Sequence, residues 1–520
     1  TGGSNVAVGM EALKANTTGG NNTSVGESSM EANTTGGNNV ALGRGTLTAN
    51  TTGSYNTALG KAALDANTTA SNNTAVGYDA LGANTTGSNN VAVGYDAMNV
   101  NTTGINNTAV GRLALDANTT ADANTAIGNA SMTANTTGTS NTGVGDGSLR
   151  ANTTASNNTA VGKDAMNANT TGAGNSAVGQ GALTSNTTGA ENTATGRLAL
   201  TSNTTASYNV ANGYRSLQTN TTGASNTAVG WDSLRYNTTG NTNTAVGPNA
   251  LNSNTTGSTN IAIGSASLHQ NTTGTLNVAI GVSSLYANTT AANNTAVGFN
   301  SLNANTTGTQ NIVVGGAAGD AITTGSYNTF VGYNAAGAAT TGTFNAFLGR
   351  SSGSEVTTGS KNTIIGSYNG NQNSLDIRTS SNNIVLSDGD GLPRLVINSG
   401  GKQSFQNGTA TGHGNFIGEV GASYKALMFE RTTGGGEVGS VVANSSSTSY
   451  NTSSDHRLKE NIDYDWDATT RLKQLKPARF NWIVDDTNTL VDGFIAHEAA
   501  TVVPECVSGT KDAVDEDGNP

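Results

Sequence analysis

A 17-residue repeat runs through most of this chain and strongly limits what it can fold into. Its signature is Asn-Thr-Ala-Val-Gly, then Ala-Leu, then Asn-Thr-Thr-Gly, and its first Asn recurs every 17 residues from Asn5 to Asn362, which makes 22 copies. No insertion interrupts the register as far as Gly366. A fixed period of this size predicts a solenoid, in which each repeat forms one coil and neighbouring coils bury what one coil cannot. We therefore expect a rod.

Charge and composition argue against several classes of function. The chain carries a net charge of −11 without a basic stripe, which argues against nucleic-acid binding. No run of about 18 apolar residues occurs, so we expect no membrane insertion. Cys506 is the only cysteine, which excludes a disulfide framework, and we expect no metal or other cofactor. The chain starts at Thr1 without a signal peptide, and both ends look like cuts through a longer protein.

The apolar residues within one repeat predict a thin core. Numbered from its Asn, each repeat has an apolar residue at position 4 in 20 of 22 copies, as at Val8 and Ile365, and we expect position 4 to point inward. The exceptions are Thr195 and Asn212 in adjacent copies, which form either a polar layer in the rod interior or a tolerated local defect. One Val-type and one Leu-type residue per coil bury little surface, so we expect several chains to associate along the rod.

Glycine and asparagine occupy positions that predict backbone geometry. Position 5 is Gly in every copy, which predicts a positive φ or a close backbone approach, whereas position 15 is sometimes Ala, as at Ala70. The Asn at position 1 would stack on itself in successive coils as a side-chain ladder. The Asn-Thr-Thr sequences match glycosylation acceptors, but we interpret them as structural.

The last three full copies have a different pattern of apolar residues. Position 9 is Leu or Met as far as Leu302 and then becomes Gly319, Ala336 and Gly353. Position 12 changes from Asn to an apolar residue in the same copies. The coincidence of the two changes predicts that these coils are repacked as a transition to the segment that follows, because terminal repeats of a solenoid are atypical.

The repeats resemble the head repeats of trimeric autotransporter adhesins, which are parallel β-rolls. The likeness rests on the Asn-Thr-Ala-Val-Gly and Asn-Val-Ala-Val-Gly sequences and covers about 360 residues. Arrays of Asn-Thr-Thr-Gly are also typical of phage tail-fibre proteins. The resemblance implies an all-β fold, a parallel β-solenoid assembled as a homotrimer, over residues 1–372.

Two further regions follow the repeat. In residues 373–453 we expect a distal β tip domain, with strands at Asn383–Ser387 and Leu392–Asn398 joined by an ordinary turn. Charged residues, Leu, Trp and Pro appear together from about Ser453 onward. This change in composition predicts a separate α+β domain in residues 454–520.

The region 454–520 contains the most specific motif of the chain. The segment Ser454–Ile462 is similar to the start of the C-terminal intramolecular chaperone domain of endosialidase-type phage tail spikes and fibres. Two later segments, Leu472–Trp482 and Gly493–Glu498, follow in the order that this family shows. The match covers about 67 residues and lacks the family's C-terminal helical part, so we expect an incomplete domain.

The resemblance implies that the chain cleaves itself between Ser453 and Ser454. Ser454 would be the nucleophile and Lys459 the general base. A lysine can accept the hydroxyl proton if desolvation lowers its pKa enough to leave it neutral. Attack on the preceding carbonyl is intramolecular, so little translational entropy is lost. We expect this Ser-Lys dyad to act on no external substrate, and we expect His497 to be packed or solvated instead of ligating a metal.

These features favour a structural and receptor-binding protein. We expect a trimeric phage tail fibre on the virion, with other tail or baseplate proteins and a host cell-surface saccharide as partners. A bacterial trimeric surface adhesin is the alternative, and a glycan-cleaving tail spike is a further one, although that enzyme would need paired carboxylates in a cleft.

Aromatic residues at position 6 suggest sugar contacts on the shaft. This position varies widely between copies, so it should face solvent, and it holds two neighbouring pairs, Tyr78 with Tyr95 and Tyr214 with Trp231. On successive coils the rings of each pair would lie about 5 Å apart. Such a platform suits the apolar face of a sugar ring, or the rings simply pack on each other along the ladder.

Overall fold

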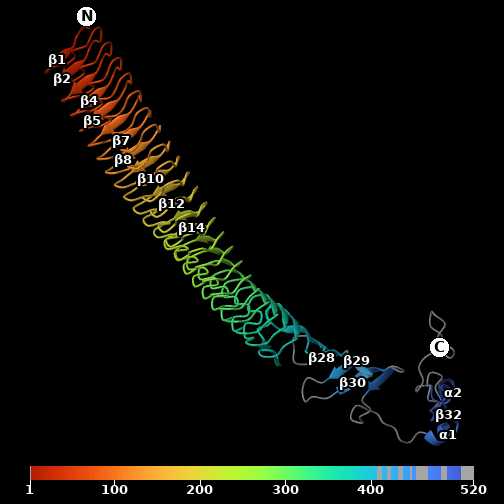
Figure 1. Cartoon of the computed structure of the whole chain (residues 1–520). Helices are drawn as coiled ribbons and strands as arrows, with labels where there is room; N and C mark the ends of the chain where they lie inside the picture. Colours follow the sequence, from red (N-terminus) through yellow and green to blue (C-terminus); the bar gives the residue numbers. More distant parts are fainter. Residues whose placement is uncertain are drawn as a thin grey trace. The chain divides into compact units, whose positions relative to one another are not determined.

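The computed structural model of the chain describes residues 2–406, 413–417, 423–430, 437–444, 448–452, 467–481 and 489–504. The chain divides into two compact units, residues 1–395 and 396–520. The first unit is a parallel β-solenoid of 22 repeated coils (Figure 1). The described regular structure is nearly all β, so the prediction of an all-β solenoid is confirmed.

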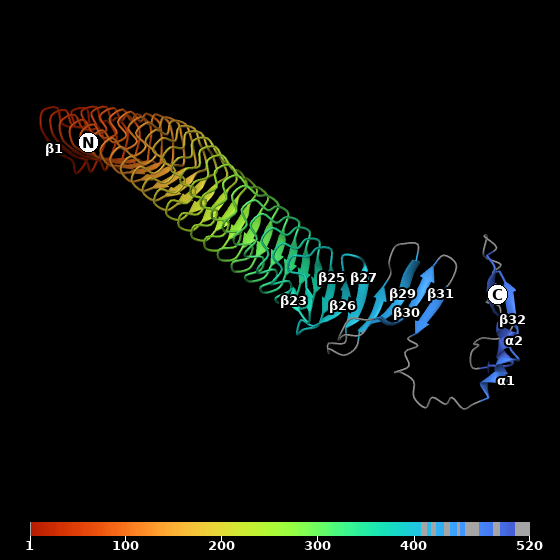
Figure 2. The ribbon, with the colours of Figure 1, turned by 90° about the horizontal axis from the view of Figure 1, so that it is seen from below.

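Each coil contributes one strand of three residues to a single parallel sheet. Every strand pairs with the next without a shift in register, so that Val6 lies opposite Thr23 and Ala346 opposite Thr363. Figure 2 shows these strands aligned along one side of the stack. The strands are β1 (Val6–Val8), β2 (Thr23–Val25), β3 (Val40–Leu42), β4 (Thr57–Leu59), β5 (Thr74–Val76), β6 (Val91–Val93), β7 (Thr108–Val110), β8 (Thr125–Ile127), β9 (Thr142–Val144), β10 (Thr159–Val161), β11 (Ser176–Val178), β12 (Thr193–Thr195), β13 (Val210–Asn212), β14 (Thr227–Val229), β15 (Thr244–Val246), β16 (Ile261–Ile263), β17 (Val278–Ile280), β18 (Thr295–Val297), β19 (Ile312–Val314), β20 (Thr329–Val331), β21 (Ala346–Leu348) and β22 (Thr363–Ile365).

The interior of each coil is filled from positions 3 and 9, and the expectation that position 4 points inward is wrong. Ala58 at position 3 and Leu64 at position 9 are fully buried, whereas Val8 and Ile365 at position 4 are 57% and 46% exposed. Neighbouring residues of a strand point to opposite faces, so a three-residue strand sends only its middle residue inward. Positions 2 and 4 therefore form the outer face of the sheet.

The glycine at position 5 is required by its backbone, as predicted. Gly213 has a φ of +138°, and a Cβ on it would lie 2.5 Å from the carbonyl oxygen of Gly230 in the next coil. An L-residue would meet both backbone strain and a steric clash at this site. Position 15 does not need a positive φ, because Ala70 occupies it as a buried residue whose φ is not positive.

Two columns of buried asparagines connect successive coils. At position 1, the side-chain oxygen of Asn22 accepts a hydrogen bond from the backbone N–H of Asn39 at 2.9 Å, and its amide donates to the carbonyl of Gly36 at 2.9 Å. At position 12, the amide of Asn50 donates to the side-chain oxygen of Asn33 at 2.9 Å. Amide-to-amide pairing is thus most regular at position 12, while position 1 binds mainly backbone. Asn33 and Asn50 are fully buried, which supports the structural interpretation of the Asn-Thr-Thr sequences.

The last coils are repacked, as the sequence predicts, by moving side-chain volume from position 9 to position 3. Phe330 and Phe347 replace the usual Ala at position 3, and both are buried with their rings stacked at a centroid distance of 5.1 Å. The stack then continues past the repeat. The short strands β23 (Asn371–Gln372) and β24 (Leu375–Asp376) pair antiparallel, and β25 (Ile384–Ser387) pairs parallel with β22.

The predicted turn after β25 is formed by Asp388. Its carboxylate accepts hydrogen bonds from the backbone N–H groups of Asp390 and Leu392, and the Arg394 guanidinium donates to it at 2.9 Å. These contacts hold the pKa of Asp388 below its usual range despite its partial desolvation. The turn leads into β26 (Pro393–Ile397), so both strands predicted here are present.

The second unit contains an antiparallel meander and a small helical segment. The meander consists of β27 (Lys402–Gln406), β28 (His413–Ile417), β29 (Ser423–Glu430), β30 (Glu437–Asn444) and β31 (Thr448–Thr452), each paired antiparallel with the next. Further along the chain lie α1 (Ala468–Leu472), β32 (Pro477–Phe480), β33 (Val491–Phe494) and α2 (Ala496–Ala500). None of the helices within the described ranges is long and apolar enough to span a membrane.

Candidate functional site

The residues predicted to carry out self-cleavage lie outside the described part of the chain. This applies to the scissile bond between Ser453 and Ser454 and to Lys459. The role of the Ser-Lys pair therefore stays a prediction.

The two later segments of the predicted chaperone domain are brought together by a β-hairpin. Strands β32 and β33 pair antiparallel, with Pro477 opposite Phe494 and Arg479 opposite Asp492. The Arg479 guanidinium donates to the Asp492 carboxylate at 2.9 Å and lowers the pKa of Asp492. Both side chains are exposed, so this ion pair contributes little to stability.

Helix α1 is fixed at both ends next to this hairpin. The Asp467 carboxylate caps it by accepting a hydrogen bond from the N–H of Thr470 at 3.1 Å. The Arg471 guanidinium donates to the carbonyl of Val502 at 2.7 Å, which joins α1 to the end of the described segment. His497 on α2 is exposed, which corresponds to the solvated one of the two alternatives predicted for it, packed or solvated. In the described residues no group of three or more His, Cys, Asp or Glu side chains could hold a metal ion.

Comparison with known proteins supports the assignment of this region. Residues 454–508 match the family model described as chaperone of endosialidase. No curated protein and no solved structure matches the chain. The region that begins at Ser454 is thus a chaperone domain of the endosialidase type, as its three sequence segments predict.

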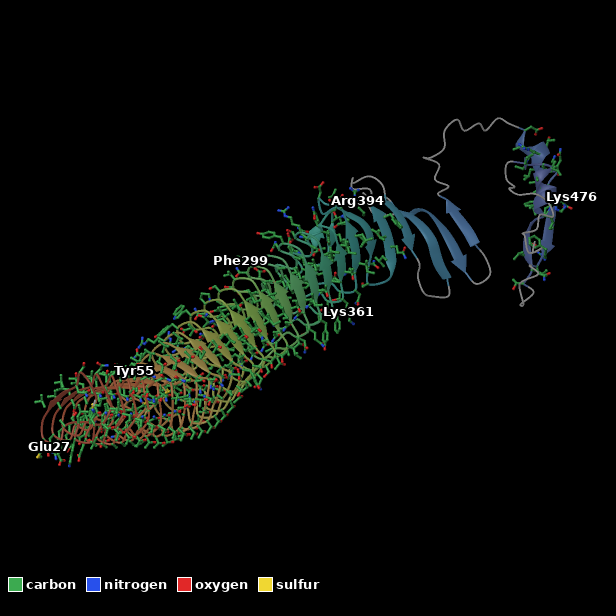
Figure 3. All side chains as sticks on the ribbon, turned by 90° about the horizontal axis from the view of Figure 1, so that it is seen from above. Glu27, Tyr55, Phe299, Lys361, Arg394 and Lys476 are labelled. Atoms are coloured by element: carbon green, nitrogen blue, oxygen red, sulfur yellow. The ribbon has the colours of Figure 1, made fainter. Side chains whose placement is uncertain are left out.

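The first aromatic pair of the shaft has the predicted geometry. Tyr78 and Tyr95 are exposed, and their rings stack at a centroid distance of 5.3 Å with 11° between the ring planes. The Lys61 ammonium lies over the Tyr78 ring at 5.1 Å. Phe299 occupies the same position of a later coil and is also exposed, and Figure 3 shows it on the outside of the shaft. The pair is therefore accessible to a ligand, with a cation at one end.

The second pair lies in a cluster of charged side chains that sequence reasoning missed. The guanidinium groups of Arg197 and Arg215 lie 5.8 and 4.5 Å from the Tyr214 ring, while Trp231 is half exposed. Arg215 donates two hydrogen bonds of 2.8 Å to the carboxylate of Asp232, whose side chain is only 6% exposed. The sequence did contain a signal for this ion pair, because Arg215 and Asp232 occupy position 7 of successive coils.

Carboxylates at position 10 form another electrostatic feature of the shaft. Burial raises the pKa of Asp65, and the neighbouring Asp79 raises it further. Burial and Asp96 raise the pKa of Asp116 in the same way. Both groups are partly exposed, and successive coils bring the like charges close together. They are a cost to stability at neutral pH.

Proposed function

We propose that this chain is the shaft and distal part of a homotrimeric phage tail fibre, located on the virion and guided in folding by its C-terminal chaperone domain. The observation that carries the proposal is the combination of a 22-coil rod with a chaperone domain of the endosialidase type at its end. Neither part resembles an ordinary globular enzyme, and together they suit a long repetitive protein that has difficulty in assembling correctly.

The need for a chaperone follows from the repeat. Three long chains with a 17-residue period can pair out of register, since one slipped coil loses few contacts. A domain that associates first at the C-terminal end would align the chains before the coils stack. Cleavage before Ser454 would then remove the template and leave the fibre kinetically trapped.

Attachment to a host is the second half of the proposal. A saccharide on the host cell surface would be bound mainly by the tip, with weak repeated contacts from Tyr78, Tyr95, Tyr214 and Trp231 along the shaft. The accessible stacked rings of Tyr78 and Tyr95 support these contacts. Other tail or baseplate proteins would hold the opposite end of the fibre.

Expression with a complete C-terminal domain tests the proposal. We expect cleavage between Ser453 and Ser454, identified by intact mass, and a trimeric product in light scattering. Ser454→Ala and Lys459→Ala should each leave a full-length chain that still trimerises. Normal cleavage of the Ser454→Ala variant would remove Ser454 as the nucleophile, and a folded monomeric product of the unchanged chain would overturn the trimeric fibre.

A further inference from the structure

The outer sheet face is an unusual surface for a single chain. We define it as the residues at positions 2 and 4 of strands β1 to β22. The chain has 23 basic and 34 acidic residues, yet none of them occupies this face. Many of its Val, Ile and Leu side chains are exposed, for instance Leu42, Ile312 and Leu348 at 45%, 49% and 49%. An apolar hollow on it is lined by Val331, Leu348 and Ile365.

The area of this face is that of an interface. With about 4.8 Å between strands and about 3.3 Å per residue, 22 strands of three residues cover on the order of 1,000 Å². A stable protein interface buries about 800 Å² on each partner. The outer sheet face is therefore large enough to hold another chain along its whole length.

The repeat identifies the partner. A surface with the same outline at every 17th residue is complementary along its length only to a partner with the same period. Another copy of this chain has that period, and two uncharged faces approach without electrostatic repulsion. A globular partner would cover a few coils and leave the others exposed.

The column of position-4 residues on this face has one place where its apolar character is interrupted. Thr195 ends β12 and Asn212 ends β13, and the two residues are paired in the parallel sheet. They lie between Val178 on one side and Val229 on the other. Asn212 is exposed in the single chain, so its amide can reach a partner on another copy. Elsewhere position 4 is Val, Ile or Leu, so no other position-4 side chain carries a hydrogen-bonding group.

We propose that copies of this chain pack against one another through the outer sheet face, and that Thr195 and Asn212 fix their register. In the correct register the polar side chains of each copy meet those of the others and form hydrogen bonds. A slip of one coil places Asn212 against Val229, and each buried polar group without a partner costs about 1–3 kcal/mol. A single buried Asn sets the register of coiled coils in the same way. This inference rests on the proposed trimeric fibre.

The first arm of the test asks whether this face is the interface. Val110→Lys with Ile127→Lys places charges on the outer sheet face, while Thr120→Lys with Thr137→Lys places them on exposed residues elsewhere on the shaft. We expect the first variant to be monomeric with its β-sheet circular dichroism retained, and the second to assemble normally. If the unchanged chain assembles and the face variant does too, this inference fails while the fibre stands. If the unchanged chain is monomeric, the proposed function itself fails.

The second arm measures register in the Cys506→Ser background. Chains with Val76→Cys are coexpressed with differently tagged chains carrying Val93→Cys, so that a disulfide between the two kinds reports a slip of one coil. We expect such products to rise at least fivefold when Thr195→Val and Asn212→Val are added, which corresponds to about 1 kcal/mol. Thr205→Val with Thr222→Val, on exposed residues of the same coils, should change nothing. An unchanged level of slipped product in the first variant would show that the register is set elsewhere.

Discussion

In the twenty-first coil the Phe347 ring fills the space that a side chain at Gly353 would need, because a Cβ on Gly353 would lie 2.5 Å from that ring. In the ordinary coil a small Ala at position 3 faces a large Leu at position 9. Here the large residue has moved to position 3 and position 9 is reduced to glycine. The core of each coil thus accepts one bulky side chain, from position 3 or from position 9, but not from both.

Replacing either residue of this pair should reduce stability, and replacing both should restore it. Gly353→Leu overpacks the coil at a cost of about 1–3 kcal/mol. Phe347→Ala leaves a cavity at a cost of about 3–5 kcal/mol. The double variant recreates the ordinary Ala-Leu arrangement, so its loss should be smaller than the sum of the two. Thermal or denaturant unfolding measures the cycle, and additive losses would contradict the shared-space interpretation.

The asparagine column at position 1 should be essential to each coil. Asn226 is fully buried, donates to the carbonyl of Gly240 and accepts from the N–H of Asn243, both at 2.9 Å. Asn226→Ala leaves the N–H of Asn243 without a partner, at about 1–3 kcal/mol, while the carbonyl of Gly240 keeps its hydrogen bond from the Asn237 amide. We expect a clearly lower unfolding midpoint. Thr222→Ala, an exposed change in the preceding coil, is the control and should alter stability by less than about 0.5 kcal/mol.

Each coil also holds ordinary residues in the left-handed conformation, which offers a stabilising substitution. Ala62 at position 7 has a φ of +58°, and the same position of the previous coil is Gly45 with a φ of +64°. A non-glycine residue in this region costs about 1–2 kcal/mol, of which the greater freedom of glycine in the unfolded chain cancels a part. Ala62→Gly should therefore raise stability slightly. Ala58→Gly, in the extended strand of the same coil, should lower it; equal effects at both sites would refute the argument.

The fold could be predicted from the sequence to the level of one coil per repeat, but not to the level of which residues face inward. The Thr-Ala-Val strand favours Val as the core residue by hydrophobicity. The narrow interior instead accepts Ala58, because Leu64 already fills it. The alternation of the strand, which places positions 2 and 4 on one face, was the decisive signal.

The candidate sites also differ in how far they could be predicted from the sequence. The chaperone domain was predictable because its three segments are specific. The surroundings of Tyr214 were not, because they depend on which side chains of neighbouring coils come together. Ring stacking of Tyr78 on Tyr95 follows from coil spacing alone, whereas the contacts of Arg197 and Arg215 with Tyr214 require knowledge of side-chain direction.

The raised pKa of Asp65 predicts the sign of a pH effect. A carboxyl whose pKa is raised in the folded state binds its proton more tightly in the folded chain than in the unfolded chain. Protonated Asp65 therefore contributes favourably to stability below the ordinary Asp pKa of about 3.9. This contribution is lost as the pH rises through the raised pKa of the folded chain. Asp65→Asn should then stabilise the shaft at pH 7 and have little effect at about pH 3.

The structure itself supplies the precedent for that substitution. Asn99 occupies the same position two coils later and donates to the Asp96 carboxylate at 3.2 Å. The Asn that replaces Asp65 should be accommodated without strain, and it removes the repulsion with Asp79. The measurement is the unfolding midpoint of the Asp65→Asn variant and of the unchanged chain at pH 7 and at about pH 3. A stabilisation that is larger at pH 3 than at pH 7 would contradict the assigned cause.

The two aromatic pairs should differ in their contribution to saccharide binding. Tyr78 and Tyr95 form a stacked, exposed platform, whereas two arginines lie close to the Tyr214 ring and leave less of it for a sugar. We expect Tyr78→Ser with Tyr95→Ser to weaken host-cell binding a few-fold, and Tyr214→Ser with Trp231→Ser to weaken it less. Normal binding by both variants would mean that the rings only pack on each other.

The tip should dominate attachment, and the structure refines how to remove it. Residues 373–395 belong to the compact unit of the shaft, and β25 pairs with β22, so deleting them would expose the end of the solenoid. The appropriate deletion is 396–453, with a substitute trimerisation domain attached. We expect this variant to keep its β-sheet circular dichroism and to lose most host-cell binding, because binding at the tip would raise the effective concentration of the weak shaft sites at the host surface. Undiminished binding by the deletion variant would move the principal receptor site onto the shaft.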